Sequence, residues 1–296
     1  MSSMRLRTAA LLVILAAARV ASAQAIPADA SAPHRQSRDP LDSKYELVID
    51  LRIELPVTIA AAGILLAAVL TQDRYGPETC RWCDTRSSLN ALDSAGLRTF
   101  PNADHHAAVI ASDVLVNGVA PVFALGLGLA SSLDATRGRS AKYRARRFGI
   151  DVLLMAESTA TALSFMQLAK FTVERRRPGY IDEPLDQPRT VNGNLSFFSG
   201  HSTQAFVLAT SAGTIASLHH ERLAPLVWVL GLTAATTTAM LRVAANEHFV
   251  TDVLTGAVVG SAIGAIVPVL HRYRSPVRLG GTASATFGML TLSGNL

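Results

Sequence analysis

Three short polar segments interrupt an otherwise apolar chain, and their side chains are those that bind and transform anions. The first, KFTVERRRP, holds Lys170 and Arg177, whose spacing of seven would place both on one face of a helix. Pro178 disfavours helix at the residue before it, so Arg177 is expected at a helix end. An ammonium and a planar guanidinium there can bind phosphate oxygens. A basic patch that binds lipid headgroups is the alternative.

The second segment is FSGHS. Gly200 lets the backbone approach a ligand closely, and we expect a helix to begin near Ser202. Backbone N–H groups at this helix start, with the hydroxyl of Ser199, would form a cradle for an anion, and His201 would lie at its rim. A histidine at the edge of a loop is otherwise an ordinary surface residue.

The third segment is LRVAANEHFVTD. His248 and Asp252 are four residues apart, so on a helix the carboxylate could bind one imidazole nitrogen and stabilise the imidazolium. A plain contact between helix neighbours has the same spacing. Arg242 lies six residues before His248 and adds a second guanidinium.

In this order, the three segments resemble the type 2 phosphatidic acid phosphatase and vanadium haloperoxidase superfamily. The family pattern is K-x6-R-P, P-S-G-H and S-R-x5-H-x3-D, and the resemblance covers about 83 residues, from Lys170 to Asp252. Phe198 stands where the family usually has Pro, and Leu241 where it usually has Ser. Neither position carries a charge or transfers a proton, so the departures bear on specificity more than on the reaction.

The resemblance implies a role for each polar residue. His248 would attack phosphorus and form a phosphohistidine, Asp252 would orient it, and His201 would protonate the leaving alcohol and then help to activate water. The resemblance also implies that no metal or other cofactor is needed, with vanadate a cofactor only in the haloperoxidase branch. The phosphate-binding residues would be Lys170, Arg177, Ser199, Gly200 and Arg242.

The elements that must position these residues are apolar. Of the 296 residues, 49% are hydrophobic and 17% are charged, and no strand-like alternation is visible. We predict an all-α fold, a bundle of about six core helices embedded in a membrane, with a helical soluble domain as the rival. Most of the apolar stretches approach the roughly 20 residues that a membrane-spanning helix needs. They are Leu55–Thr71, Ala107–Leu133, Ile150–Thr172, Thr203–Leu218, Pro225–Ala245 and Val250–Leu270.

Polar residues inside these stretches have two interpretations. Asp113 and Asn117 lie in the second stretch, and Asp151 and Glu157 in the third. A polar group in lipid is costly and is often functional. The alternative is a hydrogen-bonded contact between helices.

The first 23 residues are typical of an export signal. Arg5 and Arg7 precede a short apolar run, and Ala21-Ser22-Ala23 offers small residues for cleavage. An uncleaved first helix is the alternative. Without this segment the chain has 24 basic and 22 acidic residues, a balance that does not suggest nucleic acid. We predict four regions: signal peptide 1–23, linker or N-terminal arm 24–54, helical domain 55–275 and C-terminal tail 276–296.

Charge and cysteine positions predict which end of the bundle faces outward. Basic residues crowd segments 137–147 and 272–278, which favours the cytoplasmic side for both. Cys80 and Cys83 would then lie outside, where a local disulfide is expected, although half a zinc site or a redox pair has the same spacing. One conflict remains, because six crossings would start the chain inside whereas an export signal would leave it outside.

These observations predict a phosphatase that acts on lipid phosphomonoesters or pyrophosphates at the outer face of the inner membrane. Family members with such apolar frames act on phosphatidic acid, phosphatidylglycerol phosphate, undecaprenyl pyrophosphate or lipid A. A soluble periplasmic acid phosphatase of broad specificity is the first alternative. A vanadium haloperoxidase and a non-catalytic membrane scaffold are the others. The expected partners are a lipid phosphate and a membrane, and no nucleic acid.

Overall fold

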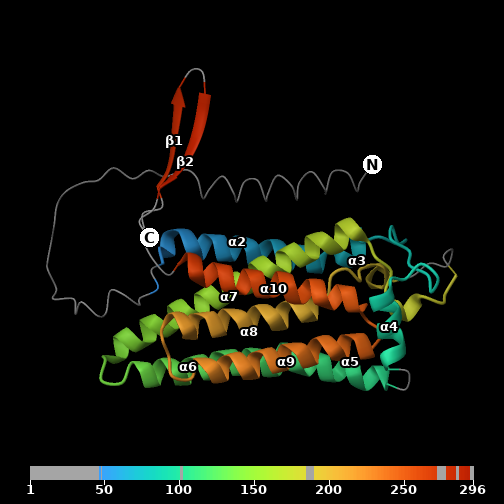
Figure 1. Cartoon of the computed structure of the whole chain (residues 1–296), viewed down its shortest axis with the longest axis horizontal. Coiled ribbons are helices and arrows are strands. Elements are labelled where there is room, and N and C mark those ends of the chain that lie inside the picture. Colours follow the sequence, from blue (N-terminus) through green and yellow to red (C-terminus); the bar gives the residue numbers. More distant parts are fainter. Residues whose placement is uncertain are drawn as a thin grey trace.

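The long helices form a bundle (Figure 1). The computed structural model describes residues 47, 49–100, 103–184, 190–271, 278–284 and 287–293. The proposed signal peptide and most of the arm lie outside these residues. The bundle helices are α2 (Leu51–Leu70), α5 (His105–Val114), α6 (Ala120–Ala135), α7 (Ala141–Val173), α8 (Gly200–Leu218), α9 (Ala224–Ala244) and α10 (Val250–Leu270).

Short helical elements lie at one end of the bundle, and two strands lie in the C-terminal tail. They are α3 (Gln72–Tyr75), α4 (Ala91–Thr99), the 3-10 turns η2 (Pro178–Tyr180) and η3 (Val191–Asn194), and strands β1 (Arg278–Ser284) and β2 (Phe287–Ser293). The two strands pair antiparallel in the C-terminal tail. The all-α prediction is confirmed for the bundle.

A π-helical turn, η1 (Leu115–Val119), joins α5 to α6 without ending the helix. Pro121 follows it and has no N–H to donate to the carbonyl four residues earlier. The missing bond accounts for a wider turn at this point. The predicted second stretch is therefore one continuous helix with a local bulge.

Helix α8 lies at the centre and packs against α10, α9, α7 and α6. Its contact with α10 is close because three glycines recur every four residues along α10: Gly256, Gly260 and Gly264. A Cβ at Gly260 would lie 2.5 Å from the carbonyl oxygen of Thr203, so only glycine allows this approach. The glycine face brings the N-terminal ends of α8 and α10 together.

Within the part of the chain that the structure describes, five helices are long and apolar enough to cross a membrane: α2, the continuous helix 105–135, α7, α9 and α10. Helix α8 is not among them, because serine and threonine lower its hydropathy, and most of it is buried. Large apolar side chains on the outer helices are exposed, among them Leu66, Val122, Val229 and Val258. An apolar outer surface of this kind fits contact with lipid.

The helices alternate in direction, so their ends gather in two groups (Figure 1). The C-terminal end of α7 and the N-terminal ends of α8 and α10 lie at the end of the bundle where α4 is drawn. The start of α2 and the α6–α7 connection lie at the opposite end. The segments that hold the candidate catalytic residues therefore meet at one end.

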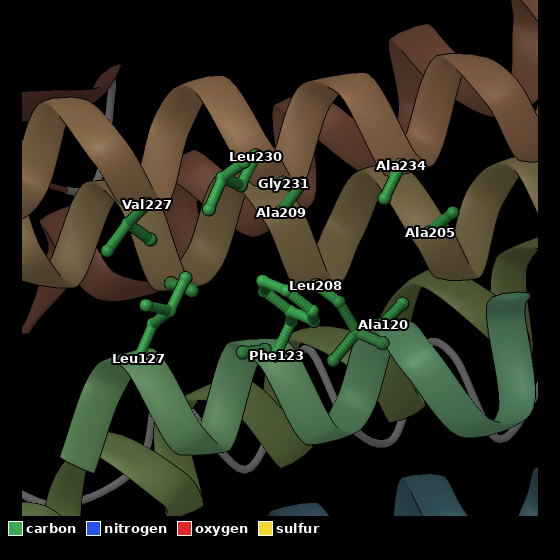
Figure 2. A pocket seen from close by; sticks show the side chains of 12 residues that line it. Ala120, Phe123, Leu127, Ala205, Leu208, Ala209, Val227, Leu230, Gly231 and Ala234 are labelled. Carbon is green, nitrogen blue, oxygen red and sulfur yellow. The ribbon is translucent and has the colours of Figure 1, made fainter. Parts of the chain in front are cut away.

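An apolar pocket of about 30 Å³ lies between α6, α8 and α9 (Figure 2). Phe123 and Leu127 face Ala205, Ala209 and Gly231 across it. Its lining holds no titratable side chain. This pocket therefore offers no group for acid–base or nucleophilic chemistry.

Candidate active site

Lys170 and Arg177 converge, but not on one helix face as predicted. Helix α7 ends at Val173, and Glu174 takes a left-handed conformation (φ 52°) that turns the chain away. Lys170 is thus in the last helical turn, and Arg177 lies in the following loop. Both are buried, and the charge of Arg177 acts on Lys170. The loop folds back over the helix end and keeps both cations at the site.

The Ser199–His201 segment starts α8, close to where the sequence predicted. The Ser199 hydroxyl caps the helix by accepting the Ser202 N–H at 3.4 Å. A Cβ at Gly200 would lie 3.1 Å from Met166 Cε, so the site has little room for a larger residue. His201 Nε2 lies 2.6 Å from Asp113 Oδ1 on α5. Since a carboxylate can only accept, Nε2 carries the hydrogen. Asp113 thus forms a contact between α5 and α8, and its partner is a candidate catalytic residue.

His248 lies in the loop before α10, not on the helix as its spacing to Asp252 suggested. Its Nδ1 atom is 3.7 Å from Asp252 Oδ2, too far for a hydrogen bond. The carboxylate instead accepts from the Ser196 hydroxyl at 2.5 Å and from the Phe249 N–H at 3.0 Å. Asp252 thus compensates charge beside His248 and fixes the start of α10, and the expected direct hydrogen bond is not formed.

Three cations and the second imidazole surround His248. Burial, and then the charges of Arg177, Lys170 and Arg242, hold the pKa of His248 well below its ordinary value. Burial, and then Arg242, also lower the pKa of Arg177, to about 10, which keeps it charged at neutral pH. His248 is therefore neutral and can act as a nucleophile in a strongly positive site.

Several donors in the site have no partner among the described residues. These buried atoms are Nε of Arg177, Nε of Arg242 and Nδ1 of His248. Buried polar groups are nearly always hydrogen-bonded, so such a group needs an explanation. An oxyanion between the two guanidinium groups would satisfy the arginine donors.

Arg175, which is not among the predicted site residues, binds three carboxylates next to the site. Its guanidinium donates to Asp84 at 2.7 Å, to Asp93 at 2.8 Å and to Asp252 at 2.6 Å. It also lies over the Phe249 ring, 4.1 Å from the centroid. Although burial opposes its charge, the carboxylates, with Asp252 foremost, raise the pKa of Arg175 above its ordinary value. Arg175 thereby ties the loop after α7 to the start of α10.

Asp93 on α4 completes this arrangement. Its Oδ1 accepts the Thr251 N–H at 2.8 Å, and its Oδ2 accepts the Thr251 hydroxyl at 2.8 Å. Asn90 caps α4 and also donates to Asp93. The first turn of α10 is therefore held by side chains from α4, which no motif in the sequence marked. The run of three arginines was the only visible signal for Arg175.

The Cys80–Cys83 disulfide predicted from the sequence is formed. The loop that it closes pairs with the segment after α7: Trp82 donates to the Glu174 carbonyl, and the Arg176 N–H donates to the Trp82 carbonyl at 3.0 Å. The disulfide loop thus supports the backbone that carries Arg175 and Arg177.

The carboxylate of Glu247 lies against the two guanidinium groups that would bind a substrate oxyanion. Its Oε2 atom contacts Nη1 of Arg177 and lies 3.1 Å from Nη2 of Arg242. The side chain is 28% exposed, so it can leave without moving the core. Glu247 therefore competes with any oxyanion that binds the two guanidinium groups.

We expect Glu247→Gln to tighten anion binding, because the variant keeps the size of the side chain and removes its charge. The inhibition constant for orthovanadate or inorganic phosphate should fall about tenfold, the effect of some 1.4 kcal/mol. Glu183→Gln, on the nearby 181–184 loop, is the control. Unchanged or weaker binding in Glu247→Gln would show that this carboxylate does not occupy the anion site.

The geometry provides a neutral, buried imidazole, a second imidazole held by a carboxylate, and three cations around one space. A nucleophile, a proton donor and a preorganised anion site are the parts that group transfer to an imidazole requires. All eight sequence-predicted residues lie at this end of the bundle, although the predicted hydrogen bond between Asp252 and His248 is not formed.

Comparison with known proteins gives a family match over the part of the chain that holds the site. Residues 151–276 match the family model described as PAP2 superfamily, and this range includes all eight predicted site residues. No curated protein and no solved structure matches the chain.

Proposed function

Because residues 151–276 belong to the PAP2 superfamily, we propose that the protein is a metal-independent phosphatase of lipid phosphomonoesters or pyrophosphates. The observation that carries the proposal is the pair of imidazoles among three cations, two of which, Arg177 and Arg242, have a buried Nε donor without a partner in the described structure. The match to the PAP2 superfamily supports phosphatase activity, and the lipid substrate and the mechanism are our inference.

In the proposed reaction His248 attacks phosphorus, and the bond between phosphorus and the leaving oxygen breaks. His201 in its protonated form donates the proton of Nδ1 to that oxygen, while its Nε2–H stays on Asp113 and holds the imidazole in place. Water then attacks the phosphohistidine while His201 takes its proton, which releases inorganic phosphate and restores His248. Lys170, Arg177 and Arg242 stabilise the charge on the phosphoryl oxygens throughout, so the reaction needs no metal ion.

We infer that the substrate is a lipid from the position of the site. It lies at one end of a bundle whose outer helices expose large apolar side chains. A bilayer around these helices would place lipid headgroups at the level of the two imidazoles. A lipid substrate could then reach His248 without leaving the membrane.

We propose that the site faces the outer, oxidising side of the membrane. The disulfide lies at the site end, and the basic 137–147 segment belongs to the opposite end. The start of α2 also lies at the opposite end, so an export signal cleaved before it does not agree with this orientation. In spheroplasts, a membrane-impermeant maleimide should label Ser87→Cys and should not label Ser140→Cys until lysis. The reverse pattern would overturn the orientation.

The substrate proposal is tested with the purified protein in detergent. Phosphatidic acid, phosphatidylglycerol phosphate and a polyprenyl pyrophosphate are compared with p-nitrophenyl phosphate, all with EDTA present. We expect kcat/KM to be highest for a lipid. A preference for the water-soluble ester would favour the soluble acid phosphatase, and bromide oxidation with added vanadate would favour the haloperoxidase. No phosphate release from any substrate by folded protein would refute the phosphatase.

The depressed pKa of His248 predicts the pH dependence of the reaction. The nucleophile acts when neutral, and it is neutral above its pKa, so a lowered pKa keeps it active into acid. The acid limb of kcat/KM should therefore lie below pH 6.5. Arg177→Gln removes one of the charges that depress this pKa, so the limb should move towards higher pH while kcat falls. An acid limb that is identical in both enzymes would contradict this assignment.

A further inference from the structure

A second cluster of chemically capable side chains lies far from the phosphatase site. Glu54 in the first turn of α2, Glu157 on α7 and His271 at the end of α10 place one ligand atom each within 4.8 Å of one another. Glu157 precedes Lys170 by thirteen residues on the same helix, about 20 Å along its axis. The cluster is therefore separate from the phosphatase site.

The hydrogen bonds of His271 determine which nitrogen faces the carboxylates. Nδ1 lies 2.7 Å from the Val267 carbonyl, and a carbonyl can only accept, so Nδ1 carries a hydrogen. Nε2 lies 3.2 Å from Glu54 Oε1. A neutral imidazole would then point a lone pair at a carboxylate. This contact is repulsive unless a proton or a cation lies between the two atoms.

Glu157 supplies an independent indication of a missing ligand. Its side chain is 8% exposed, and Oε2 is buried without a hydrogen-bond partner in the described structure. No lysine or arginine of the described residues forms an ion pair with Glu54 or Glu157. Two carboxylates and a neutral imidazole match the charge of a divalent cation.

The separation of Glu54 and His271 also agrees with a metal centre. Ligand atoms about 2.0–2.2 Å from a tetrahedral zinc ion lie about 3.3–3.5 Å apart, near the separation of Glu54 Oε1 and His271 Nε2. A metal-binding histidine usually donates its other N–H to a carbonyl or carboxylate, as His271 does to Val267. The imidazole favours zinc and similar transition metals over magnesium or calcium.

We propose that Glu54, Glu157 and His271 bind one divalent transition-metal cation, with Zn²⁺ the best match. The ion fastens α2 to the bundle. Helix α2 otherwise packs chiefly on α7, and Thr58 is its one buried residue among those described. The metal–ligand bonds link α2 to α7 and α10 and so anchor a helix that buries few of its own side chains.

The test is Zn²⁺ binding by tag-free wild-type protein in detergent, followed by calorimetry and X-ray absorption. We expect one Zn²⁺ per chain, a micromolar or tighter dissociation constant, and a first shell of nitrogen and oxygen with one imidazole. Zn²⁺, and not Mg²⁺ at the same concentration, should raise the melting temperature. A dissociation constant above roughly 1 mM, or a shell with two or more imidazoles, would overturn the proposal.

Matched variants locate the site. Glu157→Gln keeps the shape of its side chain, and His271→Asn keeps a donor for Val267 while removing Nε2. Each should weaken Zn²⁺ binding at least about 100-fold, since even residues behind the ligands contribute 10–100-fold. His106→Asn, which removes an exposed imidazole, should bind Zn²⁺ as the wild type does. Undiminished binding in folded Glu157→Gln or His271→Asn would refute the site, and the cluster would then be an ion pair with an imidazolium.

Discussion

Replacing His248 by alanine is expected to lower kcat for the best lipid substrate at least about 10⁴-fold, because the variant loses the atom that bonds to phosphorus. Losses near 10⁶-fold are known where a catalytic nucleophile is removed from an enzyme that acts through a covalent intermediate. Phosphate release in detergent measures the effect. Acid-labile labelling of the wild type by ³²P-substrate, absent in His248→Ala, identifies the intermediate.

The same variant should still bind the substrate anion. Lys170, Arg177 and Arg242 remain in place, so orthovanadate should bind His248→Ala with an affinity close to that of the wild type apart from any bond to the imidazole. This binding separates a lost nucleophile from a lost fold. Phosphate release within tenfold of the wild-type rate would rule out His248 as the nucleophile and revive the non-catalytic scaffold.

Replacing Arg175 by methionine is expected to be the most destabilising change at the site. Arg175 is buried and faces Asp84, Asp93 and Asp252, so its removal leaves three carboxylates close together without a cation. Breaking a buried ion pair by removing one partner costs about 3–5 kcal/mol. The melting temperature in detergent should fall by many degrees, and kcat should fall because Asp252 no longer holds the start of α10.

Two comparisons separate this effect from a general loss of charge. Arg86→Met removes a guanidinium that also binds a carboxylate, that of Asp182, but both side chains are about 65% exposed. Its melting temperature should change little. Adding Asp84→Asn to Arg175→Met should recover part of the lost stability, since it removes one uncompensated charge. If Arg175→Met melts with the wild type, the buried network does not stabilise the fold.

Arg175→Lys tests the positioning role in a milder way. It keeps the charge but loses the planar fork that reaches three carboxylates at once. We expect kcat to fall while orthovanadate binding changes little, because the anion-binding cations are untouched. A purely structural role would change the melting temperature and leave the kcat of the folded enzyme unaltered.

Local features of the sequence were enough to predict the chemistry and the helices. The types and spacing of the eight predicted site residues do not depend on the fold, and long apolar stretches have few stable alternatives to helices. The predicted stretch Val250–Leu270 agrees with α10 in both bounds. The other stretches differ from the helices by at most four residues, except that α7 begins nine residues before the predicted stretch, because its cap Ser140 begins the helix in polar sequence.

How these residues act on one another depends on their packing in three dimensions. Arg177 left the helix face of Lys170 because α7 ends at Val173, and His248 precedes α10, so its spacing to Asp252 did not give a hydrogen bond. The partners of Arg175 come from loops and helices 77 to 91 residues away. The residue types and their spacing were enough to identify the groups available for phosphate chemistry. The contacts among these groups depend on how distant segments pack. A buried charge needs a partner, and the partners that lie closest in space come from residues far away along the chain.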